Sequence, residues 1–512
     1  MNPEINRMSR SSTLRELMSK GADDAPAIAA PGTVPLSYRG LRTLVETTIG
    51  SLNSFGVGRN DRVAIVLPNG PDMATAFIGI ASGATAAPLN PTYKADEFEF
   101  YMSDVKAKAL VVEAGSNSPA IEVARRLGMK IIVLQPQHAN GAGAFSLSCD
   151  GASGDCLKGF AEPDDVALIL HTSGTTSRPK IVPLSQRNVS VSSGNIAETV
   201  EFTPKDGGLN IMPLFHIHGL MAGVLAPLSA GGRVFCTPGF NALRFFAWMD
   251  EARPTWYTAV PTMHQAILTR AGGNKEIIAR HPLRFVRSSS SSMPPQVIAE
   301  VEATFGAPLI ESYGMTEASH QMASNPLRGA RKPGAVGLAA GPEIAIMSNS
   351  GELLKPGEIG EIVIRGENVT KGYENNPAAN ATAFTNGWFR TGDQGTMDED
   401  RYISLTGRLK EIINRGGEKV SPREVDEILM DHPSVQQVVV FAMPHEKLGE
   451  EVAAAIVLRP DTKADEKELR DFCSQRLAAF KVPRKIVFLE QIPLGATGKL
   501  QRIGLAEKLG LA

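Results

Sequence analysis

The chain has 512 residues, of which 43% are hydrophobic and 21% charged, and its formal net charge is -2. This length exceeds one ordinary hydrophobic core and predicts two or more domains, and the composition is typical of a soluble globular protein. The near-zero net charge gives no support for binding to nucleic acid or to a membrane surface.

The four cysteines show neither CxxC nor zinc-ligand spacing, so no disulfide framework is expected. The longest apolar runs are too short and too interrupted by Gly and Pro to span a bilayer. Because the first twenty residues carry charges and lack a long apolar core, we expect no signal peptide. The lack of a disulfide framework indicates a cytoplasmic location.

Short apolar segments alternate with segments of helical periodicity through the first 320 residues. This alternation predicts α/β units and a mainly parallel sheet. Strands are expected at residues 62–67, 85–89, 109–113, 130–134, 166–170, 209–213, 233–236 and 256–260. Helices are expected at residues 14–19, 38–55, 72–83, 95–105, 121–127, 220–228 and 243–251. Residues 137–162, rich in Gly, Ala and Ser, are expected to form a surface loop.

The last third of the chain has a different pattern. Residues 330–406 carry strand and turn signals and predict a β-rich subdomain on the α/β body, and a small α+β domain is expected from about residue 410. Ser421 and Glu424 form a capping-box pattern that predicts a helix to residue 430. Further strands are expected at residues 343–347, 361–365, 402–405, 435–442, 451–458 and 485–489, and a helix at 466–477.

A stretch rich in glycine and hydroxyl groups, HTSGTTSRPK at residues 171–180, follows the strand predicted at 166–170. Glycine and short hydroxyl side chains let backbone N–H groups approach an anion, and Arg178 and Lys180 add positive charge for phosphates. The spacing is not that of a Walker A loop. Taken alone, the ten residues are equally compatible with a Ser/Thr-rich surface turn.

Two histidines and a serine run follow apolar segments. His216 and His218 lie in PLFHIHG and share a face if the preceding strand extends that far. They can line a pocket, although histidines satisfied by backbone bonds are the simpler interpretation of this motif alone. A zinc site is not expected, because no third ligand lies at metal-like spacing. Five serines at residues 288–292 can bind a carboxylate or a purine edge, with a flexible tract as the alternative.

The motif YGMTE at residues 313–317 offers three groups to a nucleotide. An aromatic ring beside glycine suits adenine stacking, the Thr316 hydroxyl suits a phosphate oxygen, and the Glu317 carboxylate suits Mg²⁺. Each assignment is weak alone, but together they complement a phosphate loop.

Two later motifs add polar groups. In RTGD, Asp393 can accept hydrogen bonds from both ribose hydroxyls, and Arg408 of GRLK can add a donor, with a plain turn as the alternative for RTGD. Lys499 lies on a glycine-containing loop between a predicted strand and the terminal helix, where a lysine is ordinarily just solvated.

Six motifs together resemble those of one superfamily. HTSGTTSRPK, PLFHIHG, SYGMTE, WFRTGD, GRLKEIINRGGEKVSPREVDEIL and GATGKLQR occur in the order and approximate spacing of the ANL adenylate-forming proteins, which include acyl-CoA synthetases, luciferases and nonribosomal adenylation domains. The resemblance covers nearly the whole chain. It implies a large α/β domain at residues 1–407, a hinge at 408–412, and a small mobile α+β domain at 413–512.

The resemblance implies two half-reactions with ATP, Mg²⁺ and coenzyme A. ATP and a carboxylate give an acyl-adenylate and pyrophosphate, and the CoA thiol then displaces AMP. The residues that it assigns to ATP or AMP are Thr172, Ser173, Gly174, Thr175, Thr176, Lys180, Glu311, Ser312, Tyr313, Thr316, Asp393, Arg408 and Lys499. Those that it assigns to catalysis are Lys499, Thr316, Glu317 and His216, with Glu317 as the metal ligand.

The same resemblance gives several of these residues a place. Residues 172–176 and Lys180 would hold the β- and γ-phosphates. Lys499 would lie against the α-phosphate and the attacking carboxylate, an electrostatic role worth about 3–4 kcal/mol per group. Lys410 would mark the hinge, and Gly416 and Gly417 would face the pantetheine tunnel.

Polar residues occupy the positions expected to hold the acyl group. Because burying polar groups without partners is costly, His218, the serine run and His320 predict a polar substrate tail, and a small dicarboxylate such as oxalate, malonate or methylmalonate fits. WYTAVPTMHQ, RSSSSSMPP and YGMTEASHQM resemble the oxalyl-CoA synthetases of plants and fungi more than the malonyl-CoA synthetases. This resemblance implies that oxalate contacts the following residues: His320, Ser290 or Ser289, and His218 or His216.

We favour His218 in the pocket, with His216 nearer the gate to the CoA tunnel. The resulting prediction is an AMP-forming ligase that joins oxalate to CoA, with small molecules as its partners and neither nucleic acid nor membrane among them. The alternatives are a malonyl, methylmalonyl or other short-chain acyl-CoA synthetase, a carrier-protein adenylation module or luciferase-like oxygenase, and a non-catalytic nucleotide-binding scaffold.

Overall fold

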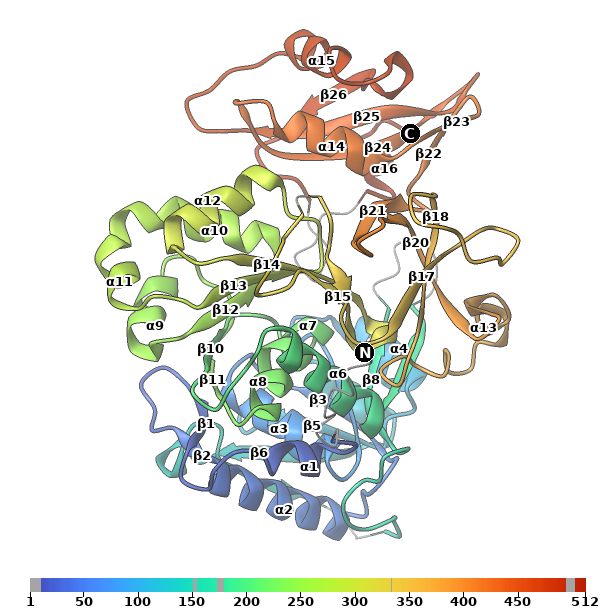
Figure 1. The fold of residues 1–512 in the computed structure, drawn as a ribbon. Coiled ribbons are helices and arrows are strands. Elements are labelled where there is room, and N and C mark those ends of the chain that lie inside the picture. Colours follow the sequence, from blue (N-terminus) through green and yellow to red (C-terminus); the bar gives the residue numbers. More distant parts are fainter. Residues whose placement is uncertain (1–10, 151–153, 173–178, 333, 494–501) are drawn as a thin grey trace, which may run out of the picture.

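The computed structural model describes residues 11–150, 154–172, 179–332, 334–493 and 502–512. A large body built from two sheets and their helices carries a smaller domain formed by the C-terminal part of the chain (Figure 1). This mixed α/β architecture, with a β-rich subdomain between the two parts, confirms the predicted fold class.

The first sheet joins seven described strands in the order β7-β6-β5-β3-β4-β8-β9. Strands β6, β5, β3, β4 and β8 are parallel, and β7 and β9 pair antiparallel at the two edges. The bounds are β3 Arg62–Val66, β4 Thr85–Pro88, β5 Ala109–Glu113, β6 Lys130–Pro136, β7 Phe145–Cys149, β8 Val166–His171 and β9 Ile181–Ser185.

The predicted surface loop at residues 137–162 is wrong in part, because it contains strand β7. Phe145, Leu147 and Cys149 alternate toward the main hydrophobic core, and β7 pairs along its length with β6. The small residues around this alternation hide it in the sequence. A short 3-10 turn, η1 His138–Asn140, precedes the strand.

The second sheet contains nine strands of the described chain, in the order β16-β15-β14-β13-β12-β10-β11-β1-β2. Its central strands from β14 to β1 are parallel. The bounds are β1 Pro26–Ala29, β2 Leu36–Ser37, β10 Gly207–Asn210, β11 Arg233–Cys236, β12 Trp256–Ala259, β13 Phe285–Ser289, β14 Leu309–Met315, β15 His320–Ser324 and β16 Leu338–Ala339.

Helices cover these sheets (Figure 1). Their bounds are α1 Leu14–Met18, α2 Tyr38–Ser54, α3 Pro71–Ala81, α4 Ala95–Asp104, α5 Ala120–Arg126, α6 Gln186–Thr199, α7 Ile217–Leu220, α8 Ala226–Ser229, α9 Phe245–Ala252, α10 Pro261–Ala271, α11 Lys275–Arg280 and α12 Pro295–Phe305. Shorter turns are the π-helix Met221–Leu225 and the 3-10 helices Gly272–Asn274 and Thr316–Ala318. No helix in the described ranges has the length and apolar character needed to cross a bilayer.

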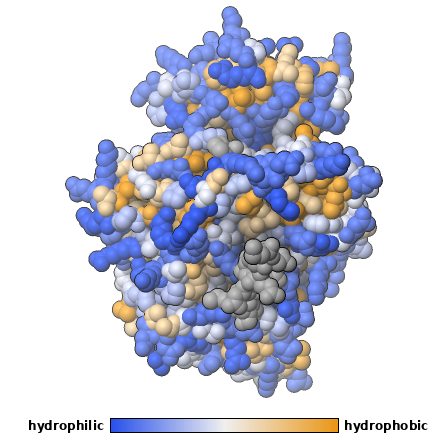
Figure 2. Space-filling model, viewed as in Figure 1, coloured by the Kyte–Doolittle hydropathy of each residue, from blue (hydrophilic) through white to orange (hydrophobic). Residues whose placement is uncertain are grey.

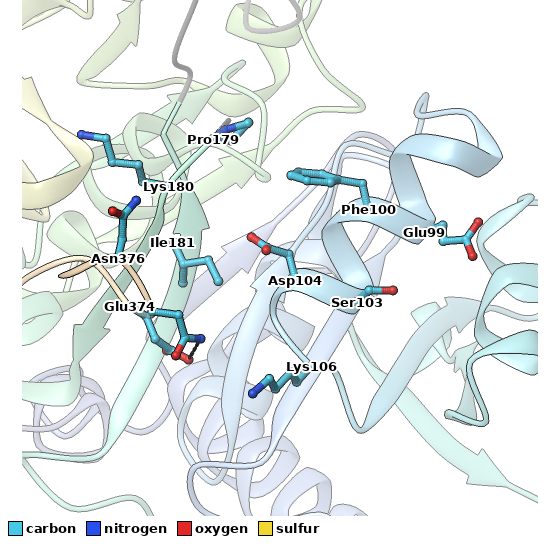
Figure 3. A pocket seen from close by; sticks show the side chains of 11 residues that line it. Glu99, Phe100, Ser103, Asp104, Lys106, Pro179, Lys180, Ile181, Glu374 and Asn376 are labelled. Atoms are coloured by element: carbon cyan, nitrogen blue, oxygen red, sulfur yellow. Dashed lines mark hydrogen bonds between the residues drawn. The ribbon is translucent and has the colours of Figure 1, made fainter. Parts of the chain in front are cut away.

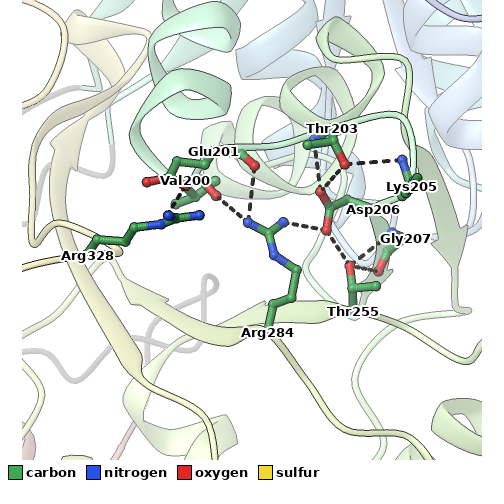
Figure 4. Close-up of polar contacts among 9 residues, drawn as sticks. All are labelled: Val200, Glu201, Thr203, Lys205, Asp206, Gly207, Thr255, Arg284 and Arg328. Carbon is green, nitrogen blue, oxygen red and sulfur yellow. Dashed lines mark hydrogen bonds and ion pairs between the residues drawn. The ribbon is translucent and has the colours of Figure 1, made fainter.

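A polar network ties together the beginnings of three neighbouring strands (Figure 4). The side chain of Asp206, before β10, is 3% exposed and accepts hydrogen bonds from Arg284, before β13, and from Thr255, before β12, the latter at 2.8 Å. Arg284 also donates to the carbonyls of Val200 and Glu201 at 3.2 and 3.1 Å. The network fixes these strands relative to one another and therefore also their carboxyl ends.

The β-rich subdomain is antiparallel. Its strands are β17 Glu343–Met347, β18 Gly360–Arg365, β19 Phe384–Thr385, β20 Trp388–Met397 and β21 Ile403–Arg408, with helix α13 Pro377–Ala383 beside them. The RTGD motif lies inside β20 rather than in a plain turn, so its side chains have fixed positions on a strand.

The C-terminal domain has its own core. Its elements are β22 Ile413–Arg415, β23 Glu418–Val420, α14 Pro422–Met430, β24 Val435–His445, β25 Gly449–Leu458, α15 Glu466–Ser474, η5 Ala479–Lys481, β26 Lys485–Phe488 and α16 Leu505–Lys508. The surface narrows between this domain and the large body (Figure 2).

Helix α14 begins where predicted, but the capping box is wrong. The Ser421 hydroxyl donates to the carbonyl of Thr406, and Glu424 pairs with Lys481 at 2.6 Å. Tertiary partners outcompete the local cap because both side chains face packed neighbours.

Candidate active site

The candidate residues gather where parallel strands of the nine-stranded sheet end. Strands β13 and β14 lie in register, so that Ser288 pairs with Glu311 and Ser289 with Ser312. Carboxyl ends of parallel strands meet at one edge of a sheet, which is where α/β proteins bind ligands. The serine run and the YGMTE motif, separated in sequence, therefore form one site.

The predicted phosphate loop connects two antiparallel strands, β8 and β9. Its base is closed by the Thr172 N–H, which donates to the Lys180 carbonyl at 2.9 Å, and by the Lys180 N–H, which donates to the Thr172 hydroxyl at 3.1 Å. The predicted phosphate ligands Ser173, Gly174, Thr175 and Thr176, and Arg178, lie outside the described residues.

An open cleft of about 720 Å³ borders the base of this loop. Lys180 and Asn376 line one side, and Phe100 and Asp104 of α4 line the other (Figure 3). Side chains of both charges line the cleft, so its lining alone selects no ligand.

Glu317, Tyr373 and Lys180 form a compact group beside the loop. Glu317 is 6% exposed as a residue, and its carboxylate accepts a hydrogen bond of 2.7 Å from the Tyr373 hydroxyl. The Lys180 ammonium lies 4.1 Å from the centre of the Tyr373 ring, in cation–π geometry. Burial raises the pKa of Glu317 and lowers that of Lys180, while the attraction between the two charges opposes both shifts.

The Glu317 carboxylate fits Mg²⁺ that arrives with a nucleotide. Mg²⁺ is usually bound by one or two carboxylates together with substrate phosphates. Among the residues that the structure describes, no group of three or more His, Cys, Asp or Glu side chains could hold a metal ion by itself. A single buried carboxylate next to the predicted phosphate loop matches this shared mode of binding.

A polar cluster joins the nine-stranded sheet to the β-rich subdomain; its members are Tyr313, Asp393 and Arg408. The Tyr313 hydroxyl donates to Asp393 at 2.6 Å, and the Arg408 guanidinium lies 3.1 Å from the other oxygen of that carboxylate. Asp393 and Arg408 face each other across β20 and β21. The negative charge of Asp393 is the main cause of the raised pKa of Arg408.

Glu311 lies buried on β14, the strand that also carries Tyr313. It accepts a hydrogen bond of 3.1 Å from the N–H of Met293. Burial raises the pKa of Glu311 to about 7, so a large fraction of this carboxyl group keeps its proton at neutral pH.

The residues predicted to bind the acid come together. His218 Nδ1 lies 3.1 Å from the Ser290 hydroxyl, and the His218 and His320 rings stack at 4.8 Å. Both imidazoles are nearly fully buried, with residue exposures of 0% and 2%. Ser289 instead donates its hydroxyl proton to the Ser312 carbonyl at 2.8 Å.

The expectation that His216 and His218 share a strand face is wrong. Strand β10 ends at Asn210, and His218 lies in the single turn of α7 with His216 as its N-cap. The helix points His218 inward and leaves His216 partly exposed. A π-helix follows α7 directly, a feature that often occurs at functional sites.

Strained backbone surrounds the residues predicted to bind the acid. Ser290, Ser319 and His320 have φ of 78°, 50° and 92°, which non-glycine residues adopt at a cost of about 1–3 kcal/mol each. Gly314 is required opposite them, because a Cβ there would lie 1.7 Å from the His320 carbonyl oxygen. The tight β14–β15 connection thereby directs His320 toward His218.

Sequence reasoning missed Arg287, which lies on β13 behind His218. Arg287 is fully buried and donates to His218 Nε2 at 3.4 Å, to Thr258 Oγ1 at 3.5 Å and to Gln321 Oε1 at 3.2 Å. Within the described part of the chain no carboxylate pairs with it, and its Nε has no hydrogen-bond partner. Burial lowers the pKa of Arg287 to about 9, which leaves it charged at neutral pH.

Tyr373 was also missed. The sequence does contain a signal for Arg287, because this charged residue stands between an apolar strand segment and the serine run at 288–292. Tyr373 follows a glycine in a polar loop and gives no comparable signal.

The predicted hinge residues lie between the two domains. Lys410 is exposed in the turn between β21 and β22, and its charge and that of Arg408 contribute to the lowered pKa of Lys180 after burial. Gly416 and Gly417 form the two-residue turn of the β22–β23 hairpin, with φ of 58° and 98°, values that favour glycine at both positions. Lys499 lies outside the described residues.

Comparisons with known proteins agree with this architecture. Residues 16–374 match the AMP-binding enzyme family and residues 424–499 match the AMP-binding enzyme C-terminal domain. The chain is 44% identical to an oxalate–CoA ligase of Arabidopsis thaliana over 96% of this chain and 97% of that protein. It is 41% identical to an oxalate–CoA ligase of Saccharomyces cerevisiae over 94% of each.

Among solved structures, ATP-bound MatB from Rhodopseudomonas palustris has a TM-score of 0.86 with 29% identity, covering 97% of this chain and 98% of that one. The chain belongs to the AMP-binding enzymes of the ANL adenylate-forming superfamily, as its six motifs predicted.

Proposed function

We propose that the protein is an AMP-forming acid–thiol ligase that activates oxalate with ATP and Mg²⁺ and transfers the oxalyl group to coenzyme A in the cytoplasm. The observation that carries this proposal is the meeting of His218, Ser290 and His320 at the strand ends next to Glu317. The two oxalate–CoA ligases that align over nearly the full chain support it.

The nucleotide lies across the strand ends in this proposal. Residues 172–176 and Lys180 hold the β- and γ-phosphates, and Thr316 meets the α-phosphate. Tyr313 flanks adenine with Glu311 and Ser312 alongside, and Asp393 and Arg408 bind ribose. The close pairing of Tyr313, Asp393 and Arg408 supports the adenosine part of this arrangement.

Glu317 would hold Mg²⁺, which would neutralise charge on the phosphoryl oxygens of the nucleotide. Its partner Tyr373 orients the carboxylate through the 2.7 Å hydrogen bond, and the Lys180 ammonium lies over the ring of that tyrosine.

The small domain supplies the remaining groups. We assign the large domain to residues 1–407, the hinge to 408–412 with Lys410 at its centre, and the small domain to 413–512. Lys499 stabilises charge at the α-phosphate during adenylation and withdraws when the small domain rotates. Gly416 and Gly417 then face the pantetheine arm of CoA.

Oxalate contacts His218, His320 and Ser290, with Ser289 beside them and His216 at the gate to the CoA tunnel. Two nearly fully buried imidazoles in stacking contact present polar rather than apolar groups, which suits an acid with no alkyl chain. Malonate has one methylene more and is the competing substrate.

The test is AMP release by purified protein with ATP, Mg²⁺ and CoA. Oxalate should be used much faster than acetate, malonate or octanoate, and a faster rate with malonate would move the substrate to that acid. Lys499→Ala should abolish adenylation but still form thioester from supplied acyl-adenylate. Equal rates in this variant and the wild type would contradict the catalytic assignment.

A further inference from the structure

We propose that Arg287 is a positioning residue that determines which proton the acid pocket presents to the second carboxylate of the substrate, and that it thereby selects a doubly charged acid. This inference rests on the proposed function, because it concerns the acid side of the same site. Its starting point is a fully buried guanidinium that contacts only neutral groups among the described residues. A guanidinium has five N–H donors and no acceptor.

The contact between Arg287 and His218 sets the tautomer of the imidazole. Because Arg287 can only donate, the Nε2 atom of His218 that it faces at 3.4 Å must accept and carries no proton. The Thr258 hydroxyl, 2.7 Å from the same nitrogen, also donates to it. The proton of the neutral ring therefore sits on Nδ1, on the side of Ser290.

The tautomer in turn determines what Ser290 can do. The Nδ1–H of His218 donates to the Ser290 oxygen at 3.1 Å, so the hydroxyl proton of Ser290 remains available for a carboxylate oxygen. The left-handed backbone of Ser290 turns its side chain out of strand β13. Ser289 cannot replace it, because its proton is already donated to the Ser312 carbonyl.

The remaining hydrogen bonds keep Arg287 in place without neutralising it. Gln321 accepts from Arg287 and uses its own amide protons on the Thr199 hydroxyl and the Ala340 carbonyl, each at 3.1 Å. A buried charge held by neutral acceptors is costly unless an anion compensates it. An acid with two carboxylates supplies that anion through both half-reactions, because only one of its carboxylates is consumed.

Oxalate and oxamate form a matched pair of substrates for this proposal, because oxamate replaces the second carboxylate by a neutral amide of similar size. We expect the wild type to prefer oxalate over oxamate in kcat/KM by roughly 100-fold or more in pyrophosphate exchange. Arg287→Met should reduce this preference to about 10-fold or less, mainly through a higher KM for oxalate. Arg287→Lys keeps the charge and should restore part of the preference.

Arg284→Met is the structural control, since Arg284 lies three residues earlier and pairs with Asp206 away from the pocket. It should lower the Tm and leave the oxalate-to-oxamate ratio unchanged. Arg287→Met should instead keep or raise the Tm, because it removes a buried charge that lacks a counter-ion. If the oxalate-to-oxamate preference falls only in variants whose Tm falls, the preference reflects stability alone and the inference is wrong.

The tautomer is directly observable by ¹⁵N NMR of histidine-labelled protein, with the His218→Gln variant to identify the signal. We expect Nδ1 protonated and Nε2 unprotonated in the wild type, and a shift toward the other tautomer in Arg287→Met. A protonated Nε2 in the wild type would overturn the proton order.

The two proposals fail separately. If the wild type does not activate oxalate, the proposed function is wrong. If the wild type activates oxalate and Arg287→Met keeps the wild-type ratio, only the role of Arg287 is wrong.

Discussion

The Tyr313 hydroxyl donates a 2.6 Å hydrogen bond to Asp393, a residue eighty positions later in the chain. This contact connects the nine-stranded sheet of the large body to the antiparallel β-rich subdomain. Asp393 also meets Arg408 at the start of the proposed hinge, so the groups that we propose bind ribose and the domain connection share one polar cluster.

Tyr313→Phe removes this hydrogen bond and retains the ring. Because a hydrogen bond to a charged group contributes about 1.5–3 kcal/mol, we expect the KM for ATP to rise by roughly 10-fold or more. Steady-state pyrophosphate exchange at varied ATP concentration measures this KM. Tyr402→Phe is the matched control, since the Tyr402 hydroxyl donates to the Ala330 carbonyl at 2.6 Å away from the site. An equal rise in KM for both variants would contradict the role of Asp393.

Glu317→Gln should lower the adenylation rate by roughly 100-fold or more and raise the Mg²⁺ concentration required. The same variant should have a higher Tm without ligands, because burial raises the pKa of Glu317 and disfavours its charged form in the folded protein. Mg²⁺ titrations of the rate and thermal unfolding measure both effects.

Asp165→Asn is the contrasting control for Glu317→Gln. Burial raises the pKa of Asp165, but hydrogen bonds from Arg59 and other groups outweigh it and lower the pKa below its usual value. This carboxylate therefore stabilises the fold, and its removal should lower the Tm without changing the Mg²⁺ requirement. A lower Tm for Glu317→Gln would show that its charge supports the fold instead.

Glu311 should make stability depend on pH. Its pKa rises from about 4.5 in the unfolded chain to about 7 in the folded protein, so the folded state holds more protons between these values. The free energy of unfolding should then fall as pH rises across this window, by about 3 kcal/mol in total. Glu311→Gln should match the wild type at pH 5 and exceed its stability at pH 8.

Urea unfolding at several pH values measures this difference. The exposed Glu352→Gln should follow the wild-type curve throughout. A Glu311→Gln curve parallel to the wild type would show that this carboxyl titrates normally in the folded protein.

The Asp206–Arg284 pair should matter for stability and not for chemistry. Asp206→Ala leaves the Arg284 guanidinium, whose side chain is 33% exposed, without its partner, and it orphans three further donors: the Thr203 N–H and the hydroxyls of Thr203 and Thr255. We therefore expect the free energy of unfolding to fall by about 3 kcal/mol. A double-mutant cycle with Arg284→Met isolates the pair from the individual side chains. The kcat of folded protein with oxalate should stay within about twofold of wild type; a larger loss would show that the strand ends had moved.

Most elements were predictable because their signals are local. Strand β5 lies at the predicted residues 109–113, α14 ends at the predicted residue 430, and α2 and α3 differ from prediction by one or two residues at their ends. Strand β7 and the capping of α14 were not predictable in this way. Strand β7 is fixed by its pairing with the preceding strand β6 and by burial against the core, and the Ser421 and Glu424 side chains of α14 are held by partners 15 and 57 residues away.

The candidate site was likewise predictable from the sequence only in part. The motifs named His218, Ser290 and His320 as a group and favoured His218 over His216, but they left Ser289 open as the alternative to Ser290. These choices depend on where β13 ends, on the single turn of α7 and on the β14–β15 connection. Each of these features follows from packing.

The sequence alone determined the superfamily, the α/β class and most of the strands and helices, because periodicity, motif order and residue chemistry are properties of the chain itself. Only the tertiary structure decided that Arg287 lies behind His218, that Tyr373 holds Glu317, and that Tyr313 reaches Asp393. These contacts join residues far apart along the chain, and their geometry exists only after the sheets have packed.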